Sequence, residues 1–229
     1  MATLAGIRRF AFRELARWQP FLRPALLAHK DGSFADEVLA AQRREFERLL
    51  DLAEDPGWFA PQMRMFTLSG AVYIALFLAL SRHGVSAQRV WEVCDAATRQ
   101  RFAATQGVER WLAGPGMLSG PMQAISRWLA RRSQKRPLGG WVFSFIEREP
   151  GQFEYGVNYS RCAIRELALS AGAADFAPYI CLADIAGSEA FAWGLARSQT
   201  LAQGGAHCDF RFRRAASTDV KVRLPVVPS

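Results

Sequence analysis

The most apolar stretch of the chain, residues 65–80, limits its fold more than any other feature, because no charge lies between Arg64 and Arg82. Spanning a bilayer usually takes about 20 apolar residues. This run is slightly shorter, contains polar positions such as Thr67 and Ser69, and has no second run of the same kind after it. We therefore expect a buried central helix at 65–80, against which the other elements pack.

Three further segments repeat apolar residues at helical spacing, which predicts amphipathic helices at 4–18, 33–53 and 87–104. We expect Pro20 and Pro24 to end the first of them. Its arginines lie opposite its apolar side chains, a pattern that also suits a helix on a membrane surface. An ordinary packed helix explains the same pattern, so we do not expect a membrane partner.

The middle of the chain changes character twice. Residues 105–123 are rich in glycine and proline and are predicted to be a connection. Residues 126–136 then concentrate basic side chains around Trp128, which is one mark of nucleic-acid contact. No recognised reading motif surrounds them, and basic turns are common on solvated helices. We therefore expect no nucleic-acid partner.

Beyond residue 137 the pattern favours strands. Residues 141–146 and 153–159 are rich in aromatic and β-branched side chains on either side of a turn, which predicts a β-hairpin. The segments that follow are predicted as helices at 162–169 and 173–184, then strands at 188–203 and 207–213.

The predicted fold class is therefore α+β, in which a helical N-terminal half packs on a small antiparallel β-sheet with helices on one face. We divide the chain into a helical region (1–136), an α+β region (137–215) and a C-terminal extension (216–229). Its 229 residues suffice for one substantial core. We expect the regions to form one integrated domain.

Net charge and cysteine content indicate which ligand charge and which cellular compartment suit this chain. The net charge is +8, which favours an anionic ligand such as a carboxylate substrate without specifying one. The four cysteines have no regular spacing, and no apolar signal segment precedes them. A cytoplasmic protein with free or metal-bound thiols is therefore expected. Composition leaves the oligomeric state open, including a homo-oligomer.

Three cysteines in the C-terminal third, Cys162, Cys181 and Cys208, each lie near an acid, an amide or a histidine. Thiolates and imidazole suit zinc, so these cysteines are candidate zinc ligands. The fourth ligand would come from Glu166, Asp184 or His207. However, no Cys-x-x-Cys pair supports a metal site, and plain packing of the cysteines remains an alternative.

The same side chains could instead carry out catalysis. A cysteine nucleophile needs a lowered pKa, which His207 could provide to Cys162 or Cys181 across the site. His207 and Cys208 are neighbours in a predicted strand and would point to opposite faces. Asp184 follows Cys181 by three residues, on the same helical face, and could act as a general base on water.

The end of the predicted hairpin contributes a second polar cluster. Alternation along a strand places Tyr155 and Tyr159 on one face and Asn158 on the other. These residues could bind a substrate, although aromatic strand residues also commonly form core.

The C-terminal pattern resembles the L-2-amino-thiazoline-4-carboxylic acid hydrolase family. The resemblance covers about 155–213 and lies in Cys162, Cys181-Leu-Ala-Asp184 and the stretch from Arg197 to Phe210. It implies hydrolytic opening of a C–N bond in a small cyclic substrate. The motif positions that it implies are Cys162, Cys181, Asp184, Thr200, Gly204, Cys208 and Asp209.

The glycine pair followed by a cysteine and an apolar strand is also similar to the small-molecule-binding domains named after vinyl reductase. Some of those domains hold zinc through cysteines, which would imply a non-catalytic binding module here. The chain lacks their close cysteine cluster.

We therefore expect a hydrolase acting on a cyclic carboxylate-bearing substrate, with the binding module as the alternative and zinc as an open question. The expected catalytic residues are Cys162, Cys181, Asp184, His207 and Cys208, and the expected substrate-binding residues are Tyr155, Asn158, Tyr159, Thr200 and Asp209.

Overall fold

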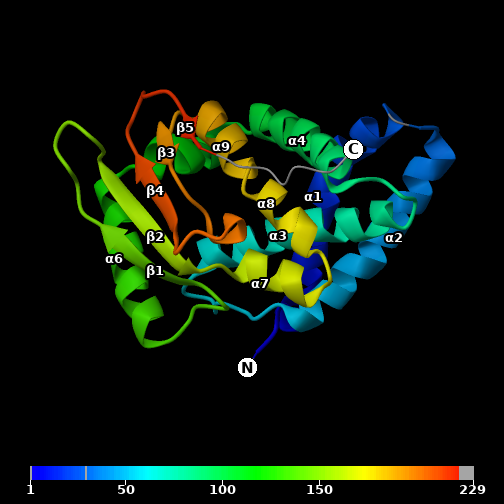
Figure 1. The fold of residues 1–229 in the computed structure, drawn as a ribbon, viewed down its shortest axis with the longest axis horizontal. Helices are drawn as coiled ribbons and strands as arrows, with labels where there is room; N and C mark the ends of the chain where they lie inside the picture. The colour runs from blue at the N-terminus through cyan, green and yellow to red at the C-terminus, as the bar shows by residue number, and fades with distance from the viewer. Residues whose placement is uncertain (1, 29, 222–229) are drawn as a thin grey trace.

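The protein combines a helical layer with a small β-sheet (Figure 1). The structure is a computed structural model that describes residues 2–28 and 30–221. Helices α1 and α2 lie at one end of the molecule, and the sheet with helix α6 lies at the other. The predicted α+β class is confirmed.

Helix α3 (Pro61–Ser81) is the centre of the helical layer. Its apolar composition and length would allow it to cross a membrane, but 67% of its most apolar window is buried inside the protein. Helix α2 (Gly32–Leu52) packs along it, and the buried side chain of Gln42 donates a hydrogen bond to the carbonyl of Val72. The predicted buried central helix agrees with this arrangement.

Helix α1 (Arg8–Leu27) follows a 3-10 turn, η1 (Leu4–Ile7), and continues through Pro20 and Pro24. The expectation that these prolines end the helix is wrong. Leu22 and Leu26 continue its buried stripe beyond Pro20, so packing outweighs the hydrogen bonds that proline removes. Helix α4 (Ala87–Ala104) packs against α1 and completes the helical layer.

The predicted connection at 105–123 is largely helical. It contains α5 (Gly107–Trp111), a π-helical turn η2 (Leu112–Gly116), and the start of α6 (Gly120–Lys135). Helix α6 runs beside the first strand of the sheet. There the Ser133 hydroxyl accepts a hydrogen bond from the Phe143 N–H at 3.1 Å. The same hydroxyl also lies 3.1 Å from the Phe143 carbonyl, to which it can donate.

The sheet has the strand order β1-β2-β4-β3-β5. All neighbouring strands are antiparallel except β3 and β5, which are parallel. The strands are β1 (Val142–Ile146), β2 (Tyr155–Arg161), β3 (Leu195–Arg197), β4 (Cys208–Phe212) and β5 (Asp219–Val220). Because β5 pairs with β3, the predicted C-terminal extension begins inside the sheet; residues 222–229 lie outside the described residues.

The helices after the hairpin are shorter and more numerous than predicted. They are α7 (Ala163–Ser170), the 3-10 turn η3 (Ala174–Phe176), α8 (Ala177–Ile180) and α9 (Ala183–Phe191). Residues 188–191 are helical, which corrects the predicted strand at 188–203. Helix α9 ends at Ala192, which has a left-handed φ of 56°, and only Leu195–Arg197 is extended before the short turn η4 (Leu201–Gln203).

Two hydrophobic cores meet near α7. The first fills the helical layer and includes residues of α7 and α8, whereas the second lies between the sheet, α6 and the start of α3. Ile164 packs against both. The C-terminal region is therefore packed into the helical layer, which places α7, α8 and α9 between that layer and the sheet (Figure 1).

Candidate functional site

The three C-terminal cysteines come together where β2, α8 and β4 meet. Cys162 is the N-cap residue of α7, directly after β2, and Cys181 follows α8. Cys208 begins β4 and pairs with Tyr159 of β2. The thiols are close enough that Cys181 and Cys208 each act electrostatically on Cys162. These positions, which are distant in the sequence, therefore share one region of the structure.

Arg197, at the end of β3, ties this region together. Its Nη1 donates to Oδ2 of Asp184 at 2.5 Å, and its Nη2 donates to the carbonyl of Cys181 at 2.8 Å. The Arg197 side chain is only 1% exposed, and its Nε has no hydrogen-bond partner among the described residues. Its guanidinium also lies 5.1 Å from the ring centre of Phe210.

Asp184, in the first turn of α9, is the accessible member of this ion pair. Its side chain is 37% exposed although protein surrounds the rest of it. That partial burial raises the pKa of the Asp184 carboxyl, and the Arg197 guanidinium opposes the rise. The result is a fixed carboxylate that solvent or a ligand can reach.

The thiols are held in the protonated state. Burial raises the pKa of Cys181 to about 12, against the opposing effect of Arg197. Burial also raises the pKa of Cys162, and it raises that of Cys208 despite a hydrogen bond to its sulfur. A cysteine nucleophile needs a thiolate, so the resting site does not contain an activated one.

The turn η4 supports Cys208 and Cys181. The backbone N–H of Leu201 donates to the sulfur of Cys208 at 3.2 Å. Thr200 is fully buried, and its hydroxyl is within hydrogen-bonding reach of the Cys181 thiol, where it lowers the pKa of that thiol against the larger effect of burial. Of the predicted substrate-binding residues, Thr200 therefore lies beside the cysteines but is buried.

Aromatic rings of the sheet form the adjacent wall. Tyr159 lies 5.4 Å from Phe210 between ring centres, and its hydroxyl group interacts electrostatically with Asp184 and Cys208. Tyr155 lies farther along the same face, where its hydroxyl donates to the Met117 carbonyl within the core. Tyr159 thus belongs to the site, whereas Tyr155 is occupied by packing.

Two predicted substrate-binding residues are on the opposite face of the sheet. Asn158 pairs with Asp209, and its side chain accepts a hydrogen bond from Arg211 at 2.8 Å. Both carboxylate oxygens of Asp209 accept hydrogen bonds from Ser198, and the backbone of Gln199 adds another. Burial alone would raise the pKa of Asp209, but these hydrogen bonds lower it. Asp209 is therefore engaged in closing the loop after β3.

His207 precedes β4, and its Nε2 lies 3.4 Å from Nε2 of Gln199. The His207 ring thus lies beside an amide of the loop after β3, whereas Cys208, the next residue, is buried. The expected alternation between His207 and Cys208 is consistent with this placement.

The geometry does not favour the zinc alternative. Within residues 2–28 and 30–221, no three side chains of histidine, cysteine, aspartate or glutamate lie together in a way that could hold a metal ion. The cysteines are neighbours, but they do not form a ligand set.

Arg197 lies at the centre of this region but is not among the catalytic or substrate-binding residues expected from the sequence. It carries the only charge between Glu189 and Asp209, and an isolated charge in an uncharged segment is a signal that could have identified it. A buried charge usually requires a partner, so this position also predicts an acid nearby.

Comparison with known proteins adds one positive finding. A family model described as L-2-amino-thiazoline-4-carboxylic acid hydrolase matches residues 65–212. This range runs from α3 to the end of β4 and includes Arg197, Asp184 and all three clustered cysteines. No curated protein and no solved structure matches the chain.

Proposed function

The chain belongs to the L-2-amino-thiazoline-4-carboxylic acid hydrolase family, and from this premise we propose that it opens a small ring carrying an amidine and a carboxylate. The observation that supports this proposal is the ion pair of accessible Asp184 with buried Arg197, beside Cys181 and Cys208. A carboxylate that is fixed in position and reachable by water is what hydrolysis of such a ring requires.

Asp184 is the proposed general base. Its carboxylate takes a proton from water while the water oxygen bonds to the amidine carbon of the ring. The resulting tetrahedral carbon carries the ring nitrogen, the ring sulfur, the outer nitrogen and the new oxygen. Return of the proton to the departing ring atom breaks one ring bond, so the net change is addition of one water molecule.

Arg197 is the proposed positioning residue for this step. It is already bonded to Asp184 and to the Cys181 carbonyl, so it fixes the carboxylate relative to the thiols. The protonated thiols of Cys181 and Cys208 then contribute a neutral, polarizable surface, in place of the nucleophile considered from sequence.

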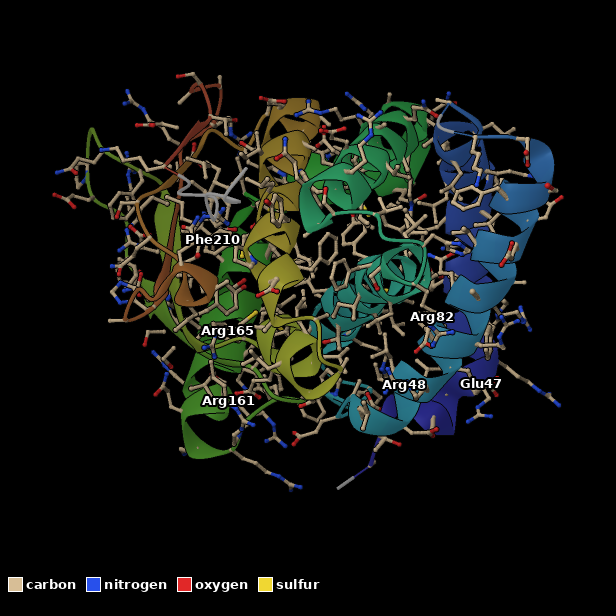
Figure 2. All side chains as sticks on the ribbon, turned by 45° about the vertical axis from the view of Figure 1, so that its right-hand side comes forward. Glu47, Arg48, Arg82, Arg161, Arg165 and Phe210 are labelled. Atoms are coloured by element: carbon tan, nitrogen blue, oxygen red, sulfur yellow. The ribbon has the colours of Figure 1, made fainter. Side chains whose placement is uncertain are left out.

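Arg165 is the proposed partner of the substrate carboxylate. It lies in the first turn of α7, three residues after Cys162, and has no ion pair with any described residue, whereas Arg161 is paired with Glu166. Figure 2 shows Phe210, Arg165 and Arg161 in succession along the boundary between the sheet and α7. The positive charge of its guanidinium favours an anion, whereas the backbone N–H groups of Ile164 and Arg165 already hydrogen-bond to the Cys162 sulfur.

The direct test is to incubate the purified protein with L-2-amino-thiazoline-4-carboxylate. Ring loss is followed by ultraviolet absorbance and addition of water by mass. We expect turnover that falls by about 10²–10⁴-fold in Asp184→Asn, the range for loss of a general base. The matched control is Asp175→Asn, which removes an exposed carboxylate from η3 and should leave turnover unchanged.

The product identifies the bond that breaks. Cleavage of the ring C–N bond, as the sequence resemblance implies, gives a thiocarbamate without a free thiol. Cleavage of the C–S bond instead releases a thiol that a thiol reagent detects. Full turnover in Asp184→Asn would contradict the assignment of the base.

An intact ring together with a raised melting temperature would instead support the binding module.

A further inference from the structure

The exposed face of α6 is basic and aromatic, and it lies at the opposite end of the molecule from α1 and α2 (Figure 1). No acidic residue occurs between Glu109 and Glu147, a segment that contains all of α6. We define the α6 surface as the exposed residues of this helix together with the neighbouring Trp58. Its members are Trp58, Ile125, Trp128, Arg131, Arg132 and Lys135.

The apolar part of the α6 surface is unusually exposed. Trp58 is 84% exposed, Trp128 50% and Ile125 47%. The partly buried ring of Phe59 lies between the two tryptophans, about equally far from each, at 6.1 Å from Trp58 and 6.0 Å from Trp128. The two exposed indoles are therefore held on one ordered support, not on separate loops.

The basic part of the surface lies at the next turns of the same helix. The guanidinium of Arg132 lies 4.5 Å from the ring centre of Phe59, which fixes a positive charge beside the tryptophans. Lys135 has no ion pair with any described residue. Since residues at spacings of three and four share a helix face, Ile125, Trp128 and Arg132 form one stripe.

We propose that the α6 surface binds an anionic lipid surface. Tryptophan and arginine or lysine together are the combination that proteins place at the boundary between lipid headgroups and acyl chains. The surface contains three basic residues and no acid, and the neighbouring Glu147 is already paired with Arg127, so the surface is complementary to negatively charged headgroups. Exposed Ile125 favours lipid over nucleic acid, because an aliphatic side chain gains from contact with hydrocarbon and not from phosphate.

This inference differs from the expectations drawn from sequence. The sequence alone makes the first helix the membrane alternative and indicates a solvated helix at 126–136. The first helix is now the natural comparison, because Arg9 and Arg13 of α1 are exposed as well and lie on a helix at the other end of the molecule.

The test is vesicle flotation of the full chain. Vesicles of phosphatidylcholine with phosphatidylglycerol should carry the protein, and vesicles of pure phosphatidylcholine should carry much less. Salt on the order of 1 M should release it, because the Debye length then falls to about 3 Å. The variant Arg131→Glu/Lys135→Glu should weaken binding at least about tenfold, since each basic residue near such a surface contributes about 1 kcal/mol.

Matched controls separate this surface from net charge and from hydrophobicity. Arg9→Glu/Arg13→Glu makes the same change in net charge on α1 and should retain binding. Trp128→Ala should weaken binding, whereas Trp111→Ala, which removes a tryptophan of similar exposure from α5, should not. Circular dichroism verifies that each variant is folded.

Three results would overturn the proposal. The first is no flotation with anionic vesicles at low salt, and the second is equal loss in the Arg9/Arg13 variant. The third is that the protein binds RNA or duplex DNA but not vesicles, and that the Arg131/Lys135 variant loses this binding. That result would assign the surface to nucleic acid.

Discussion

The ion pair of Glu45 in the helical layer and the ion pair of the candidate site are built in opposite ways. In the first the acid is buried: the Glu45 side chain is 8% exposed and is paired with Arg82, which is 60% exposed, and with Arg48. Figure 2 shows Arg48 and Arg82 on the helical side of the molecule, away from Phe210. In the site the arginine is buried and Asp184 is accessible.

This inversion separates structural carboxylates from chemically useful ones. A buried glutamate surrounded by exposed arginines cannot meet a substrate, so its ion pair serves the fold alone. A buried arginine that holds an accessible aspartate has the opposite consequence, because the reachable member is the one that can exchange protons. The location of the buried partner thus indicates the role of the pair.

Breaking the site pair from its buried side should have the largest effect. We expect Arg197→Met to lose about 3–5 kcal/mol of unfolding free energy, because it removes two hydrogen bonds from a charged donor, to Asp184 and to the Cys181 carbonyl, each contributing about 1.5–3 kcal/mol. It should also lose most of its turnover. Urea unfolding with the activity assay measures both.

Arg197→Lys keeps the charge but cannot donate from two fixed nitrogens to Asp184 and the Cys181 carbonyl at once. Relative to Arg197→Met, it should therefore recover more stability than activity. Wild-type stability in Arg197→Met would show that the pair does not hold the site together.

The corresponding change in the helical layer should affect stability only. Glu45→Gln removes the charge that accepts from Arg48 and Arg82, and we expect a loss of roughly 1.5–3 kcal/mol, the range for hydrogen bonds to charged groups. Turnover of the folded variant should equal that of the native protein. A fall in turnover at temperatures where the variant is fully folded would end the distinction between the two kinds of pair.

Arg165 allows a smaller and more selective change. Arg165→Gln should raise KM about tenfold, corresponding to about 1.4 kcal/mol of substrate binding, with little change in kcat. The control is Arg161→Gln, which removes a nearby arginine that is already paired with Glu166. Equal effects in the two variants would argue for general electrostatic attraction in place of a specific contact.

The pH dependence should show the smallest but most diagnostic effect. Because the pKa of Asp184 is raised, the activity of a general base at this position should fall on acidification at a higher pH than for an ordinary aspartate. The acid limb of kcat/KM against pH measures this.

Rising pH should increase the activity of Asp184 as a base but decrease its contribution to the stability of the fold. The folded protein keeps the Asp184 proton up to a higher pH than the unfolded chain does. Rising pH through that interval therefore costs the folded state stability. Asp184→Asn removes the titrating group, so its stability relative to the native protein should increase as the pH rises through the same interval. An unchanged difference would contradict the raised pKa.

Sequence patterns predicted the parts of the fold that depend on local periodicity. The apolar run at 65–80 and the hairpin at 141–159 have strong periods, and both are present. The strand predicted at 188–203 failed because its apolar residues belong partly to α9. Nothing local distinguishes buried helical residues from strand residues in a short apolar segment.

The sequence predicts most residues of the candidate site but not the contacts between them. Its cysteines and Asp184 were identified, whereas Arg197 was not, since its contact with Asp184 exists only because β3 returns beside the start of α9. Asn158 and Asp209 were assigned to the substrate, but they lie on the other face of the sheet, with side chains already hydrogen-bonded.

The pairing of β2 with β4 also governs when the site can exist during synthesis. Tyr159 meets its partner Cys208 only after α7, α8, α9 and β3 have been made, whereas α1 to α4 can pack as soon as they emerge. Such distant pairing closes slowly compared with contacts between neighbouring helices. A nascent chain interrupted before β4 would thus carry a helical layer beside an exposed hairpin face, a target for chaperones, and the proton-transfer site would be the last part of the molecule to mature.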